Sequence, residues 1–160
     1  IVVVGILSEK EEKFFFVDNP AKEKEVLSDV VEYFEKLKGE KIYIWNANFD
    51  IPFLITRCIK HGLTTKVFTK LKIIDLLKFS KEMLKLSSNR LDDVSVFFGL
   101  SKNLKVRGKN IQELYEEYLA GNDKMKDKII EHCKDDLLRT KEIFQKAKDL
   151  IEFWEKKKNL

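Results

Sequence analysis

Residues 42–54 most constrain the fold, because within them a strand pattern changes directly into a helix pattern. Residues 42–45 (Ile, Tyr, Ile and Trp) favour a half-buried strand, and a helix is predicted over residues 51–60. Pro52 suits the first turn of that helix, since the N–H that proline lacks would have no partner there. A strand that runs straight into a helix is typical of α/β folds, in which ligands bind beyond the carboxyl ends of the strands.

Asp50 lies at this junction, just beyond the end of the predicted strand. Two roles are open to it, and its position alone favours them about equally. It could be the N-cap of the helix and accept backbone N–H groups. It could instead be a functional carboxylate at the ligand-binding edge of the sheet.

The whole chain, residues 1–160, predicts a single globular domain. Hydrophobic residues make up 44% and charged residues 36%, with six Gly and two Pro, so a disordered or linker-dominated chain is excluded. The expected elements are strands at 1–7 and 13–18, a helix at 21–38, a strand at 42–45, a helix at 51–60, a strand at 71–74, and helices at 76–86, 91–98, 111–120 and 124–157. This order predicts an α/β fold with a mixed β-sheet flanked by helices.

Charge, cysteine content and hydrophobicity limit the partners, the cysteine chemistry and the cellular location that we expect. A net charge of +4 permits a polyanionic partner without demanding one. Cys58 and Cys133 lie far apart and have no CxxC spacing, so neither a disulfide nor a zinc site is predicted. The sequence has no apolar run long enough for a membrane span and no recognisable signal peptide, so we expect a cytoplasmic protein with no membrane partner.

A second polar feature is the pair His132 and Asp136 in the predicted helix 124–157. Residues four apart lie on one face of a helix, and this face continues into the apolar stripe, so both side chains are expected to point inward. Taken alone, the pair is more simply a partly buried ion pair. Asp135 is a competing candidate, but one residue turns a helix by about 100°, so the spacing from His132 favours Asp136.

Two motifs, in this order, resemble those of the DEDD (DnaQ-like) family of 3′–5′ exonucleases. The first is Asp50, preceded by Asn46 and Asn48 and followed by an apolar helix, and the second is the helical pair His132 and Asp136. The resemblance covers nearly the whole chain and is closest to the branch related to family-B DNA polymerase exonuclease domains. It implies an RNase H-like fold.

The resemblance also implies a chemistry, the hydrolysis of phosphodiester bonds at single-stranded 3′ ends of DNA or RNA by a two-metal mechanism. Asp50 and Asp136 match the family's metal ligands, and Mg²⁺ or Mn²⁺ suits such oxygen donors. His132 matches the residue that orients or deprotonates the attacking water. The subclass stays open, because the polymerase-related branch more often has Tyr at position 132, and the His-bearing branch usually has Ala where this chain has Lys134.

Several other polar or aromatic residues are candidates for substrate binding or have a simpler role. Asn46 and Asn48 are about equally expected to hold substrate or to cap the helix. Phe49 could stack on a base, but core packing is favoured. The remaining substrate candidates are the cations of the basic loop, Lys102, Lys105, Arg107 and Lys109. Asp75 is expected to be structural and His61 to lie at a helix end without chemistry.

The family's first motif, Asp-x-Glu on the opening strand, has no match in the sequence. In this fold that strand is central and lies between the strands at 1–7 and 42–45, so we expect an RNase H-like exonuclease domain that is incomplete at its amino terminus and lacks two of four carboxylates. The leading hypothesis is a metal-dependent 3′–5′ exonuclease. The alternatives are a non-catalytic RNase H-like module that binds nucleic acid or another protein, and a structural domain without a nucleic-acid role.

Overall fold

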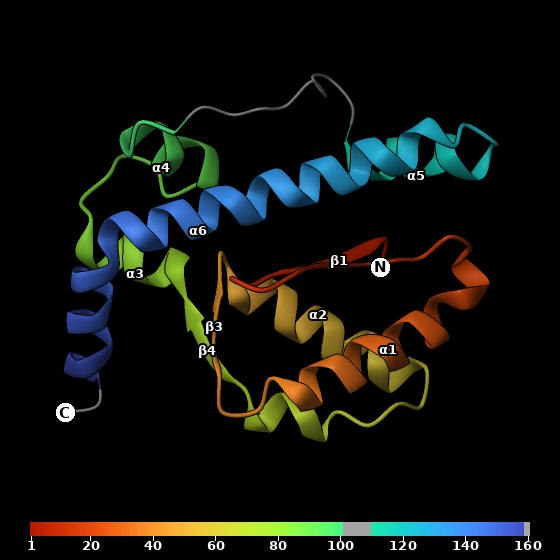
Figure 1. The fold of residues 1–160 in the computed structure, drawn as a ribbon, viewed down its shortest axis with the longest axis horizontal. Helices are drawn as coiled ribbons and strands as arrows, with labels where there is room; N and C mark the ends of the chain where they lie inside the picture. Colours follow the sequence, from red (N-terminus) through yellow and green to blue (C-terminus); the bar gives the residue numbers. More distant parts are fainter. Residues whose placement is uncertain (101–109, 159–160) are drawn as a thin grey trace.

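The computed structural model describes residues 1–100 and 110–158 of the chain. Its helices are η1 (Pro20–Lys22), α1 (Glu23–Lys36), α2 (Ala47–Lys60), η2 (Lys66–Lys70), α3 (Leu76–Met83), α4 (Leu91–Phe97), α5 (Ile111–Leu119) and α6 (Lys124–Lys158). The long helix α6 crosses the molecule from end to end, with α4 on one side of it and the strands on the other (Figure 1). Helix α5 packs along the first part of α6 and also against β2. Helices α1 and α2 lie beyond the strands, so the strands are enclosed between helical layers.

The four strands form two separate two-stranded sheets. β1 (Val3–Leu7) and β2 (Glu12–Phe16) make an antiparallel hairpin, whereas β3 (Lys41–Ile44) and β4 (Lys72–Asp75) pair in parallel. The predicted mixed α/β class is therefore confirmed. Within the described residues β1 and β3 each have a strand partner on one edge only, and the central strand expected between them stays a prediction.

The junction between β3 and α2 differs in detail from the prediction. The helix begins at Ala47 rather than at residue 51, so Pro52 is the sixth helical residue and its predicted place in the first turn is wrong. Asn46 occupies the N-cap position with a left-handed backbone (φ 69°), which turns the chain sharply from strand to helix. Asp50 lies in the first turn of α2, so the alternative that Asp50 is the N-cap is also wrong.

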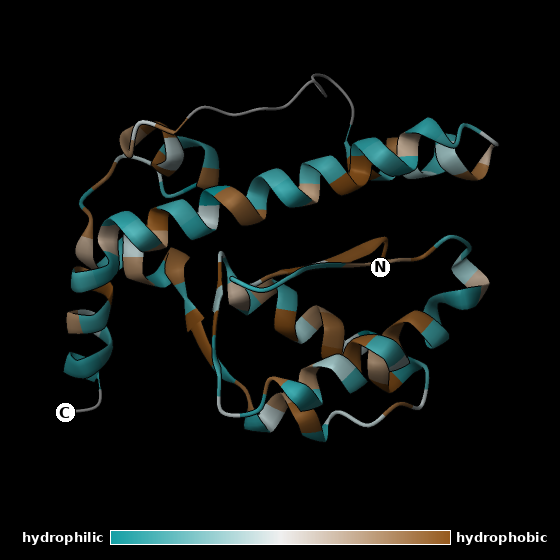
Figure 2. Cartoon of the chain, viewed as in Figure 1, coloured by the Kyte–Doolittle hydropathy of each residue, from teal (hydrophilic) through white to brown (hydrophobic). Residues whose placement is uncertain are grey.

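Three apolar clusters hold these elements together. One packs α1 and α2 against the hairpin around Leu27 and Cys58, and a second packs α3 against the carboxyl-terminal part of α6 around Phe79 and Trp154. A third joins β2, α5 and the start of α6 around Ile129. In Figure 2, β1 and β4 are largely hydrophobic, while α6 carries hydrophobic bands among hydrophilic ones. In the described part of the chain, no helix has both the length and the hydrophobicity needed to cross a bilayer.

Gly5 sets how closely α6 approaches β1. A Cβ atom at this position would lie 2.6 Å from Cys133 Sγ and 2.9 Å from Leu137 Cδ1, both on α6. Any larger side chain would therefore push the helix away from the strand. The absence of a side chain at Gly5 thus brings the middle turns of α6, which carry His132 and Asp136, down onto β1.

Candidate functional site

Asp50 and Asp136 both act on the thiol of Cys133. Burial is the main reason that the pKa of Cys133 is raised to about 11, and the negative charges of Asp136 and then Asp50 raise it further. The two carboxylates come from different elements, α2 and α6. The tertiary structure therefore brings together the two residues that the sequence motifs singled out.

His132 and Asp136 face each other along α6. His132 Nδ1 lies 3.5 Å from Asp136 Oδ2, at the outer limit of a hydrogen bond, and the side chain of Asp136 is 41% exposed. The histidine ring is also partly exposed. Both groups are thus accessible from solvent. The prediction that both side chains point into the core is therefore wrong.

A buried arginine, Arg139, lies one turn further along α6. Its guanidinium contacts three carboxylates, with Nη2 2.6 Å from Asp136 Oδ1, Nη1 2.7 Å from Asp92 Oδ1, and Nε 2.9 Å from Asp135 Oδ2. The contact with Asp135 is an ion pair without hydrogen-bond geometry. Asp135 thus pairs with Arg139, whereas Asp136 pairs with Arg139 and also faces His132.

Asp75 connects the end of β4 to the start of α2. Its carboxylate accepts hydrogen bonds from the backbone N–H groups of Leu77 and Lys78, which caps α3, and also from the N–H of Asn46 at 3.2 Å. Asp50 is an exposed residue, but neighbouring atoms surround its carboxyl group enough that burial raises its pKa. The negative charge of Asp75 raises this pKa as well. Asp75 therefore has the predicted structural role, and it lies close enough to Asp50 to affect its charge.

The aromatic and amide candidates are placed differently from one another. Phe49 is 63% exposed, so the favoured expectation that it packs in the core is wrong. It stacks on Phe53, which is also exposed, with ring centroids 5.9 Å apart and nearly parallel planes (9°). Asn48 is exposed and its backbone N–H approaches Asp75, while the side chain of Asn46 makes no cap hydrogen bond.

Two other predictions concern the periphery of this region. His61 ends α2 as predicted, and its ring contacts Glu23, which also pairs with Arg57. The cations of the basic loop, Lys102, Lys105, Arg107 and Lys109, lie outside the described residues.

Asp50 and Asp136 do not make a complete metal site by themselves. Among residues 1–100 and 110–158, no three His, Cys, Asp or Glu side chains are arranged so that they could hold a metal ion. The donor types nevertheless suit a hard cation, because carboxylate oxygens are its preferred protein ligands.

The sequence-based prediction missed Arg139. One signal for it was present, since Arg139 precedes Ile143, Ala147 and Ile151 at steps of four and so shares their buried face. A cation on a buried helical face requires acidic partners, and Asp135 stands four residues before it. Its third partner, Asp92, comes from α4 and could not be identified without the fold.

Comparison with known proteins gives two matches. A family model described as RNase_H superfamily matches residues 1–148. An uncharacterized protein of Methanocaldococcus jannaschii is 32% identical over 135 residues, which cover 75% of this chain and 76% of that protein. The family match confirms the RNase H-like fold that the sequence motifs predicted.

Proposed function

This chain belongs to the RNase_H superfamily, whose members are generally nucleases, and we propose that it is a DEDD (DnaQ-like) 3′–5′ exonuclease acting on single-stranded ends of DNA or RNA. The observation that supports the proposal is that Asp50, on α2, and Asp136, on α6, both lie close enough to Cys133 for their charges to raise its pKa. Their order in the chain, and the helical His132 before Asp136, follow the family's second and third motifs.

Asp50 and Asp136 are the residues proposed to hold Mg²⁺ or Mn²⁺. When bound, such ions activate a water molecule and stabilise the leaving 3′ oxygen. Burial and the charge of Asp75 raise the pKa of Asp50. A bound cation would act in the opposite direction and favour the ionised carboxylate.

His132 is proposed to move the proton of the attacking water. Its Nδ1 faces Asp136 Oδ2, which orients the ring, and Nε2 is the atom assigned to accept the proton. An imidazole has an ordinary pKa of about 6.5, so it can accept and release protons near neutral pH. This role is the same whether the chain belongs to the Tyr-type or the His-type branch.

Phe49 and Phe53 are proposed to contact the substrate. Their exposed, stacked rings lie on the same helix as Asp50, and stacking on an aromatic ring contributes about 1–3 kcal/mol per base. Phe49→Ala should therefore raise KM for a single-stranded oligonucleotide by roughly 5-fold to 100-fold while leaving the melting temperature nearly unchanged. Phe97→Ala is the matched control, because Phe97 is also an exposed phenylalanine (59%) but lies on α4. Equal effects of the two changes would contradict the assignment.

The exonuclease proposal is tested with the full-length protein and single-stranded DNA and RNA labelled at the 5′ end, in the presence of Mn²⁺. Progressive shortening from the 3′ end is expected. Asp50→Asn and Asp136→Asn should abolish it, and His132→Ala should slow it by about 100-fold or more. Asp149→Asn, an exposed carboxylate of the same helix α6, is the control and should leave the rate unchanged. Cleavage that persists in both aspartate variants would refute the proposal.

A second candidate is a non-catalytic module that binds nucleic acid. One observation favours it: Asp136 is already paired with Arg139. In addition, no three metal-binding side chains are grouped among the described residues. This candidate predicts binding of single strands that weakens steeply with salt, no cleavage with Mn²⁺ or Mg²⁺, and equal affinity in wild type and Asp136→Asn.

A further inference from the structure

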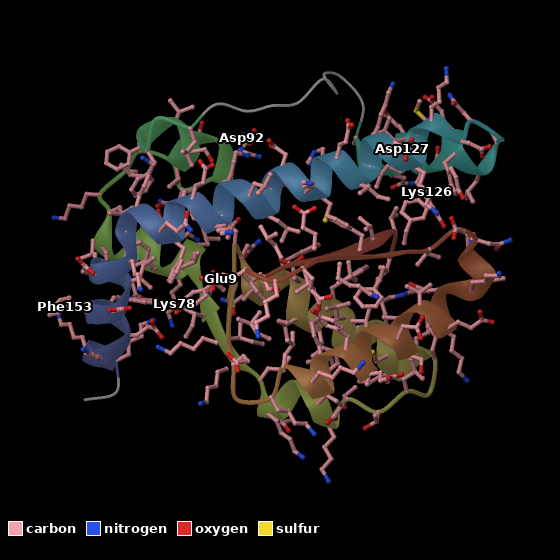
Figure 3. The ribbon with its side chains drawn as sticks, viewed as in Figure 1. Glu9, Lys78, Asp92, Lys126, Asp127 and Phe153 are labelled. Atoms are coloured by element: carbon pink, nitrogen blue, oxygen red, sulfur yellow. The ribbon has the colours of Figure 1, made fainter. Side chains whose placement is uncertain are left out.

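Arg139 is a buried cation outside the motifs. Its side chain is 4% exposed, yet its guanidinium contacts Asp92 of α4 as well as Asp135 and Asp136 of α6. Nη1 also lies 3.4 Å from Ser95 Oγ. Figure 3 labels Asp92 where α4 borders α6. A fully buried cation is costly unless it is paired, so these contacts fix the position of the guanidinium.

The contact with Asp136 uses only one of its two oxygens. Oδ1 accepts a hydrogen bond from Arg139, and Oδ2 faces His132. A carboxylate has about four lone-pair sites, so Asp136 can keep this bond and still act as a ligand. The three carboxylates around one guanidinium also leave an excess of negative charge, which favours a cation nearby.

We propose that Arg139 is a positioning residue, which holds the Asp136 carboxylate in the orientation that directs Oδ2 toward His132. This inference rests on the proposed function, because it concerns how a metal ligand of that site is oriented. Arg139 itself is buried, with a side chain that is 4% exposed, so it is assigned to act through Asp136. Asp135, four residues before it on the same helix, also pairs with the guanidinium, with Nε 2.9 Å from Asp135 Oδ2.

A purely structural role is the competing explanation, since Arg139 also ties α6 to α4 through Asp92. The two roles make different predictions for Arg139→Lys. Lysine keeps the positive charge, but a single ammonium group cannot contact three carboxylates as the planar guanidinium does. A change in metal affinity in this variant therefore reports lost orientation rather than lost charge.

The experiment compares the full-length wild type with Arg139→Lys, and with Asp92→Asn as the control that weakens the ion pair between Arg139 and α4 while leaving Arg139 beside Asp136. The readouts are the Mn²⁺ dissociation constant by calorimetry, the melting temperature, and KM and kcat on a labelled oligonucleotide. For Arg139→Lys we expect Mn²⁺ binding or kcat to weaken about 10-fold to 100-fold, as for other residues that orient ligands, with KM changed less than about twofold. Asp92→Asn should lower the melting temperature with Mn²⁺ affinity within about threefold of wild type.

Equal losses of Mn²⁺ affinity in the two variants, or none in Arg139→Lys, would overturn the positioning role. A wild type that neither binds Mn²⁺ nor cleaves would overturn the proposed function instead. In that case crystal structures without metal decide the positioning role alone. A changed Asp136 rotamer in Arg139→Lys supports it, and the same rotamer in both proteins overturns it.

Discussion

Gly5→Ala tests whether the close approach of α6 to β1 depends on a missing side chain. The new Cβ would lie 2.6 Å from Cys133 Sγ, 2.9 Å from Leu137 Cδ1 and 3.1 Å from the ring of Phe14. Atoms of these types do not come closer than about 3.5 Å without repulsion, so the helix or its side chains must shift.

Whether Gly5→Ala raises or lowers the free energy of unfolding distinguishes backbone propensity from this packing conflict. Without a steric conflict, replacing a strand glycine by alanine should stabilise by about 0.5–1 kcal/mol, because alanine loses less conformational entropy on folding. Overpacking costs about 1–3 kcal/mol. We therefore expect Gly5→Ala to lower the free energy of unfolding by about 0.5–2 kcal/mol, and the melting temperature by about 2–4 °C for each kcal/mol.

Urea denaturation of four proteins measures this effect, namely the wild type, Gly5→Ala, Cys133→Ala and the double variant. Removing the sulfur eliminates the nearest conflict, while the end of Leu137 can rotate aside. Gly5→Ala should therefore cost less in the Cys133→Ala background than in the wild type. A stabilising Gly5→Ala, or an equal cost in both backgrounds, would refute the reasoning.

Three further predictions concern single carboxyl or thiol groups. Burial opposes ionisation of Glu23, but hydrogen bonds from Arg57 and His61 hold its pKa well below the ordinary value of about 4.3. Its contribution to stability is therefore full above that pH and is lost as the pH falls. Glu23→Gln should remove this acid-side loss from a profile of unfolding free energy against pH, measured by urea denaturation. Burial, with the nearby carboxylates, raises the pKa of Cys133 to about 11, so iodoacetamide at pH 8 should label the native thiol on the order of 100-fold more slowly than a free cysteine, and equal rates would contradict its burial. Asp75→Ala should lower the free energy of unfolding in urea by about 1–3 kcal/mol, because it removes a helix cap and a link to α2, and a loss below about 0.5 kcal/mol would contradict this role.

The order of the elements and the candidate motifs could be predicted because they depend on local patterns. Apolar spacing at three and four residues predicted α6 to within a residue at its end, and the β-favouring residues at 42–45 predicted β3 to within a residue at each end. The helix face shared by His132 and Asp136 follows from a spacing of four residues alone. These features involve residues near one another in the chain, so the sequence carries them directly.

Boundaries and local turns were less well predicted. The start of α2 was placed four residues late, since Pro52 suggested a first turn whereas the left-handed backbone at Asn46 begins the helix earlier. The short helix η2 was not predicted. In both places the competing local conformations differ little in energy, and packing against the neighbouring elements decides between them.

The sequence by itself determined the α/β class, the order of the motifs and the identity of the candidate carboxylates. Only the tertiary structure decided which side chains meet. It brought Asp50 and Asp136 near enough to one thiol, that of Cys133, for both charges to raise its pKa, left Phe49 exposed, and paired Arg139 with Asp92 of another helix. The physical reason is that burial and ion pairing depend on what packs against each face, and those neighbours are distant in the chain.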